Sequence, residues 1–166
     1  MKIFNPYNPY QPYKIYTPLV HIRFAHLNDL DIIVSNNILM AKETESIKLK
    51  KEIIYQGVKT LLEDSSKGFY IVAEDNGKIA GNLMITFECS DWRNSMIWWL
   101  QSVYVAADCR KQGIFKKMFA FVKEEAQKQK VSLLRLYVYK ENITAKKTYS
   151  QVGMEKTYYD HYEITV

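Results

Sequence analysis

The segment DCRKQGIFKKMF, residues 108–119, places one glycine within a run of basic residues. The stretch before it, residues 96–105, is apolar and proline-free like a strand, whereas Ile114 and Met118 after it begin a helical repeat. A loop from a strand into a helix offers unpaired backbone N–H groups and the positive end of the helix dipole. Gly113 lets a ligand approach the backbone closely. The segment predicts an anion site, although basic residues at a helix start can also be a solvated face.

The rest of the chain alternates strand-like and helix-like segments around this loop. Asn76-Gly77 is the dipeptide best suited to a tight hairpin turn. A helix beginning at Asn28 or Asp29 is joined to the next by the acidic segment 41–45. We expect strands at 19–24, 69–73, 78–87, 96–105, 133–139 and 154–166, and further helices at 46–62, 114–126 and 142–153. The order β-α-α-β-β-β-α-β-α-β predicts a three-layer α/β or α+β domain whose later strands run parallel across a helical crossover.

Length and composition indicate one globular domain, which we place at residues 18–166. The chain has 166 residues, 48% of them hydrophobic and 25% charged. Residues 1–17 contain Pro6, Pro9 and Pro12, each followed by tyrosine, and favour an extended arm. This arm is either a poorly ordered tail or a segment whose tyrosines pack on the domain or on a partner subunit. A homodimer is therefore left open.

Several classes of protein and site are not indicated by the sequence. No apolar run approaches the roughly 20 residues of a membrane span, and the N-terminus lacks the apolar core of a secretory signal, so we expect a cytoplasmic protein without membrane contact. Cys89 and Cys109 form no C-x-x-C pair, so no metal site is expected. The triphosphatase loop, G-x-G-x-x-G and H-E-x-x-H are absent. The remaining candidate ligand is a cofactor held mainly by backbone.

A second motif lies near the end of the chain. Asn142, Ala145 and Tyr149 fall at i, i+3 and i+7, so they share one face of a helix. They either line a groove beside the strand 133–139 or form an ordinary capped helix with a packed tyrosine.

Taken together, these motifs resemble the acetyl-CoA-binding half of the GNAT superfamily of N-acetyltransferases. The resemblance rests on QSVYV, R-K-Q-G-I, an amphipathic helix, LRLYV, N-I-T-A-K-K-T-Y and V-G-M, and covers residues 98–154 closely. It implies a GNAT-like domain with a central mixed sheet of six to seven strands flanked by four helices. Arg110 and Gly113 fit the family's loop pattern [QR]-x-x-G-x-[GA], whereas Phe115 stands where a small residue is usual. Its ring either stands against the diphosphate or points into the core.

The resemblance also implies the cofactor and its contacts. Acetyl-CoA would lie between two splayed strands and transfer its acetyl group directly to an amine, with an N–H near Val103 stabilising the oxyanion. Tyr149 matches the family's general acid and is protonated at neutral pH. The expected cofactor-binding residues are Val103, Tyr104, Val105, Arg110, Lys111, Gln112, Gly113, Ile114, Phe115, Asn142 and Ala145.

The general base and the acceptor are less constrained. Some relatives carry a glutamate where this chain has Trp99 and Gln101, so Glu88 and Asp91 are the remaining candidates for the base, unless they are solvated loop charges. The residues expected near the acceptor are Glu43, Glu45, Asp91 and Trp92. Carboxylates beside aromatic rings favour a small cationic amine as the acceptor, and a protein or peptide amine is the second choice. Two alternatives remain: a noncatalytic module that binds nucleic acid through its basic loop, which we do not expect, and an acyl-CoA sensor.

Overall fold

The structure is a computed structural model that describes residues 20–166, so the expected arm at 1–17 lies outside the described residues. Its helices and strands follow in the order β1 (His21–Phe24), α1 (Leu30–Glu45), α2 (Lys51–Glu63), β2 (Gly68–Asp75), β3 (Lys78–Ser90), β4 (Ser95–Val105), α3 (Ile114–Lys128), β5 (Leu133–Arg135) and α4 (Ile143–Gln151). Short 3₁₀ turns occupy Leu27–Asp29 and Ala107–Cys109.

The strands form one mixed sheet in chain order, β1-β2-β3-β4-β5. Neighbours from β1 to β4 are antiparallel, and β5 runs parallel to β4 after the crossover through α3. The mixed sheet and the helical crossover predicted from the sequence are therefore confirmed. The Asn76-Gly77 turn is also confirmed, because both residues have positive φ angles, 50° and 76°.

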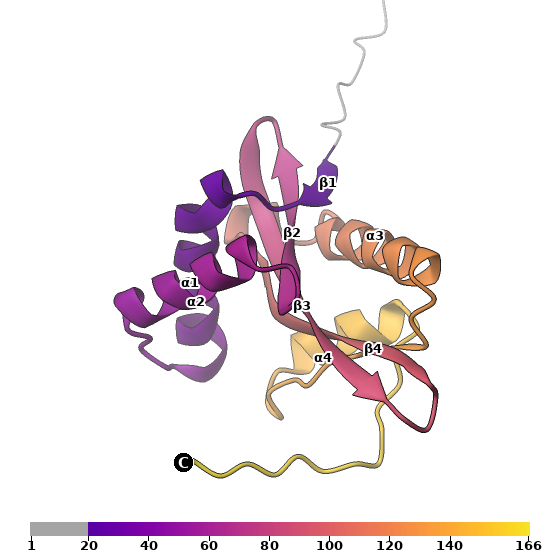
Figure 1. Cartoon of the computed structure of the whole chain (residues 1–166). Helices are drawn as coiled ribbons and strands as arrows, with labels where there is room; N and C mark the ends of the chain where they lie inside the picture. The colour runs from indigo at the N-terminus through magenta and orange to yellow at the C-terminus, as the bar shows by residue number, and fades with distance from the viewer. Residues whose placement is uncertain (1–19) are drawn as a thin grey trace, which may run out of the picture.

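Helices cover both faces of the sheet, which gives the three expected layers (Figure 1). Successive strand residues point to opposite faces, so Tyr70 and Val72 pack against α1 and α2 while Ile71 packs with α3. The apolar stripe of α3, including Met118 and Val122, is fully buried on that second face. Among residues 20–166, no helix has the length and apolar character needed to cross a membrane.

Three expectations about the elements are wrong. The described sheet has five strands rather than six or seven, because residues 154–166 form no ladder with any described strand. The strand expected at 133–139 pairs only through Leu133–Arg135. The acidic segment 41–45 is not a linker but the last turn of α1, which ends where Ser46 adopts a left-handed conformation with φ 57°.

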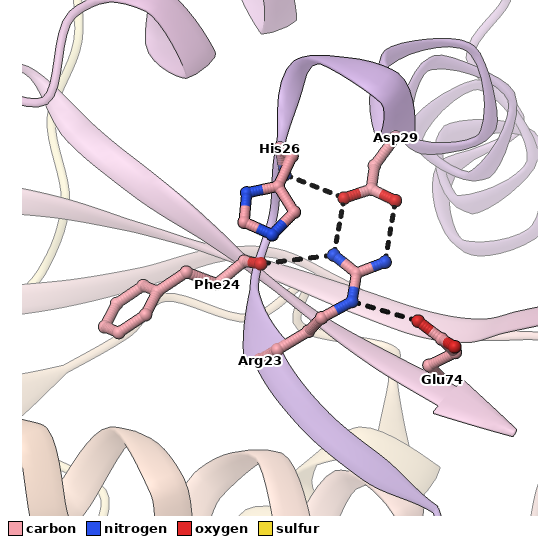
Figure 2. Close-up of polar contacts among 5 residues, drawn as sticks. All are labelled: Arg23, Phe24, His26, Asp29 and Glu74. Atoms are coloured by element: carbon pink, nitrogen blue, oxygen red, sulfur yellow. Dashed lines mark hydrogen bonds and ion pairs between the residues drawn. The ribbon is translucent and has the colours of Figure 1, made fainter. Parts of the chain in front are cut away.

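An ion-pair cluster joins β1 to β2 and to the start of α1 (Figure 2). Arg23 donates two hydrogen bonds to Asp29, at 2.7 and 3.0 Å, and its Nε donates to Glu74 at 2.9 Å. Burial opposes ionisation of Asp29, but its bonds with Arg23 and the His26 amide still hold its pKa below the usual range. The cluster secures the chain where it leaves the sheet for the first helix.

Candidate active site

The two parallel strands separate beyond their short ladder. Pairing covers only Ile97–Trp99 of β4 and Leu133–Arg135 of β5. From Leu100 onward, β4 pairs with β3 on one side but not with residues 136–139 on the other. Backbone donors and acceptors of both segments are therefore available to a ligand, apart from the carbonyls of Ser102, Val105 and Tyr139, which already accept hydrogen bonds.

A bulge in β4 accompanies this separation. Ser102 has a positive φ of 48°, and the β3–β4 register shifts between Asn82 and Met84. The fully buried Asn82 donates to the Ser102 carbonyl at 3.0 Å and accepts from Asn36 of α1 at 2.8 Å. Because these amides lie in the core with their bonds satisfied, they hold the bulge in one geometry.

Two adjoining cavities occupy the region where the strands part. The larger has a volume of about 820 Å³ and lies among β4, the loop before α3, and α4. The smaller, of about 310 Å³, is lined by residues of β4 and of the unpaired segment 137–139. Val103, Asn142 and Tyr149 line both, so the cavities meet beside the Tyr149 ring.

The predicted anion loop borders the larger cavity. Gly113 is the N-cap of α3 with φ 77°, a left-handed conformation that favours glycine. A Cβ placed there would meet no protein atom within 4 Å, so the backbone angle, rather than crowding within the chain, accounts for the glycine. Five of the six predicted loop residues line the cavity: Arg110, Lys111, Gly113, Ile114 and Phe115. Gln112 instead donates to the Asp108 carbonyl at 3.1 Å.

Phe115 takes the second of its two predicted orientations. Its side chain is buried, and its ring lies edge-on to Tyr149 with the centroids 5.4 Å apart. The bulky residue therefore supports Tyr149 from the core.

The predicted face of α4 lines the larger cavity as a unit. The Asn142 side chain accepts a hydrogen bond from the Ala145 amide at 3.0 Å and so caps the helix. Ala145 and Tyr149 follow along the cavity wall. Burial raises the pKa of the Tyr149 hydroxyl, so this phenol keeps its proton at neutral pH.

The three carboxylates expected near the acceptor lie in three different places. Glu43 is paired with Arg110 at 2.6 Å and accepts from the Tyr104 hydroxyl at 3.1 Å. The hydrogen bond with Arg110 lowers the pKa of Glu43 and burial raises it, and the net effect holds that pKa below its usual range. Glu45 lines the smaller cavity. Asp91, with its neighbour Trp92, lies in the turn at the tip of the β3–β4 hairpin and lines neither cavity.

Glu88 belongs to a polar row on the sheet face that carries the smaller cavity. Its carboxylate accepts from the Trp99 indole at 2.5 Å and from Arg135 at 3.2 Å. In the same row, Gln101 donates to Thr86 at 2.6 Å and accepts from the Tyr137 hydroxyl at 3.3 Å. Gln101 lines the smaller cavity, whereas Glu88 does not.

Sequence reasoning missed several lining residues. Met40 and Thr44 of α1 border both cavities, and Thr144 and Thr148 of α4 border the larger one. Thr148 stands three residues after Ala145, beside the predicted face, so a wider helical stripe would have included it, whereas Thr144 lies off that face. Met40 and Thr44 carried no such signal, because only the tertiary fold brings α1 to β4. Within residues 20–166, no three His, Cys, Asp or Glu side chains gather to hold a metal.

The two cavities suit the chemistry of acetyl-CoA. The amides at the start of α3, together with Lys111 and Lys116, suit phosphate oxygens. The unpaired edge of β4 suits a peptide-like pantetheine arm, which carries amide donors and acceptors of its own.

Comparisons with known proteins agree with this geometry. Residues 36–154 match the model of the acetyltransferase (GNAT) family. A structure described as a possible acetyltransferase from Clostridium difficile 630 is similar at 42% identity and a TM-score of 0.83, over 89% of this chain and 97% of that one. A structure described as a predicted acetyltransferase with acetyl-CoA, from Clostridium acetobutylicum, shares the fold at 18% identity and a TM-score of 0.73, over 89% and 96% of the two chains.

A ribosomal-protein-alanine N-acetyltransferase from Brucella melitensis biovar Abortus 2308 also shares the fold, at 19% identity and a TM-score of 0.71, over 89% and 99% of the two chains. No curated protein sequence matches the chain significantly. The family match covers well over half of the chain and includes both predicted motifs. The chain therefore belongs to the GNAT family of N-acetyltransferases, enzymes that use acetyl-CoA as the acetyl donor.

Proposed function

We propose that this enzyme transfers the acetyl group directly to a small cationic amine, with the reaction centred at Tyr149. The observation that carries the proposal is the meeting of the two cavities beside the Tyr149 ring, where β4 and residues 137–139 lie unpaired. One cavity takes the cofactor and the other takes the acceptor. Acetyl-CoA, when bound, supplies an acetyl group activated as a thioester.

In this proposal, the larger cavity binds the cofactor. Arg110 and Lys111, with the amides of Gly113, Ile114 and Phe115, would hold the diphosphate. The free edge of Val103–Val105 would bind the pantetheine arm, and Asn142 and Ala145 would line its path along α4. Gln112 does not line this cavity and donates to the Asp108 carbonyl, so we assign it a role in the loop rather than in binding.

Two groups of the chain act at the reacting carbonyl. The Val103 amide would stabilise the negative charge that develops on the acetyl oxygen, because Val103 lies at the bulge and lines both cavities. The Tyr149 hydroxyl would donate its proton to the departing thiolate. Its raised pKa keeps that proton in place across the physiological range.

The smaller cavity favours a cationic acceptor. Glu45 lies at its rim together with Tyr137 and Tyr139, so a carboxylate and two aromatic rings are offered together. Within residues 20–166, Glu45 has no ion-pair partner, whereas the charge of Glu43 is already matched by Arg110. We therefore assign the acceptor's positive charge to Glu45. Trp92, which the sequence placed near the acceptor, is 87% exposed at the hairpin tip and lines neither cavity, so it has no part in this proposed site.

Of the two candidates for the base, Glu88 is the better situated. It shares a sheet face with Gln101, which lines the smaller cavity, and its carboxylate is oriented by Trp99 and Arg135. Since Glu88 does not itself line the cavity, it would take the amine's proton through water.

The test combines two measurements on the full chain. Calorimetric titration with acetyl-CoA checks cofactor binding, and thiol release checks transfer to triamines, diamines, monoamines, a neutral aromatic amine and a peptide N-terminus. We expect acetyl-CoA to bind and thiol release to be fastest with diamines or triamines. Binding without thiol release from any amine would make the protein a sensor, and no binding would contradict the proposal entirely.

A matched pair of variants checks the acceptor assignment. Glu45→Gln should raise KM for diamines about two- to fivefold, because an exposed charge pair contributes up to about 1 kcal/mol, with little change for the neutral amine. Glu52→Gln removes an exposed glutamate from the first turn of α2 and should leave both KM values unchanged. Equal effects of the two substitutions would exclude a specific contact at Glu45.

A further inference from the structure

Three side chains from distant parts of the chain meet at the wall of the larger cavity. Glu43 lies in the last turn of α1, Tyr104 in β4 and Arg110 in the loop before α3, and all three line the cavity. One carboxylate oxygen of Glu43 accepts a hydrogen bond from the Tyr104 hydroxyl at 3.1 Å, and the other accepts from Arg110 at 2.6 Å. Because each oxygen has its own donor, the carboxylate is held in one orientation.

These contacts also fix the guanidinium of Arg110. Its Nε donates to the Val105 carbonyl at 2.9 Å, one terminal nitrogen donates to Glu43, and its central carbon lies 5.5 Å from the centroid of the Tyr104 ring. A guanidinium carries five N–H donors. Within residues 20–166 the two hydrogen bonds to Val105 and Glu43 use two of them, so three are left for a ligand in the cavity.

Glu43 has two opposite effects on an anion in this cavity. Its negative charge repels the anion, but its bond with Arg110 orders a long side chain before the anion arrives. The repulsion is weak, because Arg110 neutralises the carboxylate and the two side chains are 37% and 44% exposed to water. A ligand that must itself order a flexible side chain loses about two- to tenfold in affinity. The ordering effect is therefore the larger of the two.

We propose that Glu43 is a positioning residue for the cofactor, which holds Arg110 where its free N–H groups meet the diphosphate. The inference rests on the proposed contact of Arg110 with that diphosphate. The Tyr104 hydroxyl supports the arrangement by fixing the second oxygen of Glu43. The last turn of α1 then serves both cavities, because Glu43 acts on the cofactor through Arg110 while Glu45 faces the acceptor.

Calorimetric titration of the full chain with coenzyme A tests the proposal without requiring acetyl transfer. Glu43→Ala should weaken binding about three- to tenfold, although it removes a negative charge from an anion site. Glu43→Gln keeps an oxygen that can accept from Arg110 and an N–H that can donate to the Tyr104 hydroxyl oxygen. Its affinity should stay within about twofold of the parent. Charge repulsion by Glu43 would instead make both variants bind more tightly.

A double-mutant cycle with Arg110→Ala distinguishes positioning from a general role of Glu43 in the structure of α1. Without Arg110, the carboxylate of Glu43 has nothing to position and only repels the anion. Glu43→Ala should therefore weaken binding in the parent but tighten it in the Arg110→Ala background. Loss of α1 structure would weaken binding in both backgrounds. Circular dichroism and melting temperature check that every variant folds.

The outcomes separate this inference from the proposed function. If Arg110→Ala weakens coenzyme A binding but Glu43→Ala does not, the positioning role is overturned and the Arg110 contact stands. Equal weakening by Glu43→Ala in both backgrounds would also overturn the positioning role. If Arg110→Ala leaves the affinity unchanged, the proposed contact of Arg110 with the diphosphate fails, and the role of Glu43 fails with it.

Discussion

The side-chain amide of Asn82 donates a hydrogen bond of 3.0 Å to the backbone carbonyl of Ser102, across the bulge that turns β4 away from β5. Asn82 is fully buried, and its side-chain oxygen accepts from Asn36 of α1. One residue of β3 thus links the bulge to the helix that borders the cavities. This arrangement makes the bulge a fixed feature of the site rather than an irregularity of the strand.

Replacing Asn82 with leucine should destabilise the protein by about 2–4 kcal/mol and lower kcat. The substitution leaves the buried Asn36 amide and the Ser102 carbonyl without partners, and an unmet buried hydrogen bond costs about 1–3 kcal/mol. Urea unfolding measures the stability change. Asn36→Ala, which removes a single partner, should cost less, and a smaller loss for Asn82→Leu than for Asn36→Ala would contradict this account.

Replacing Tyr149 with phenylalanine should lower kcat about 100-fold, in the usual range for loss of a general acid. The ring and its contact with Phe115 are kept, so the affinity for acetyl-CoA should change little. Thiol-release kinetics and calorimetric titration measure the two effects. Unchanged kcat would remove Tyr149 from the mechanism.

The pH dependence of kcat provides a second check on Tyr149. An acid must be protonated to donate, and burial raises the pKa of this phenol above its ordinary value of 10.0. As pH rises to 10.0, Tyr149 should therefore stay protonated and cause no loss of kcat. A loss should begin only as pH rises through the raised pKa of Tyr149. The Phe variant should lack that alkaline decline, so an identical decline in both proteins would assign it to another group.

The two carboxylates predicted as bases should behave differently. Glu88→Gln removes the candidate proton acceptor and weakens the contact with Arg135, so kcat/KM should fall about tenfold or more. Asp91→Asn alters a residue of the hairpin tip whose carboxylate accepts from the Trp92 amide, and should leave kcat/KM unchanged. Profiles of kcat/KM between pH 5 and 9 measure both variants. A larger loss of kcat/KM for Asp91→Asn than for Glu88→Gln would make Asp91 the better candidate for the base.

Replacing Asp29 with asparagine should reduce stability at neutral pH by about 3 kcal/mol, because Arg23 then loses its main partner in a largely buried site. The native pKa of Asp29 lies below its ordinary value of 3.8, so its contribution is complete above that value and is lost as pH falls through the native pKa. The acid branch of a stability profile measured by urea unfolding should therefore flatten in the variant. Asp31→Asn, at an exposed position in the first turn of α1, should cost only a few tenths of a kcal/mol.

Local patterns predicted the elements that depend on near neighbours in the chain. The Asn76-Gly77 turn, the α3 start at Gly113 and the α4 cap at Asn142 each depend on a backbone angle or a bond within four residues. The order of these elements, with the loop and α4 motifs, was sufficient to predict the GNAT fold and acetyl-CoA as cofactor. The strand predicted at 154–166 forms no ladder with a described strand, because strand pairing depends on a distant edge that local pattern does not specify.

The sequence pattern could not predict chemistry that depends on contacts between distant segments. Glu43 and Arg110 lie 67 residues apart in sequence but meet as an ion pair, so the charge of Glu43 has a partner within the chain. Glu88 and Asp91 are near neighbours in sequence, yet one faces a polar row on the sheet and the other occupies the hairpin tip. Residue type and spacing determine local conformation through short-range sterics and hydrogen bonds. Which charges neutralise one another, and which remain free to meet a substrate, was decided only when folding brought α1, β4 and α4 around the same cavities.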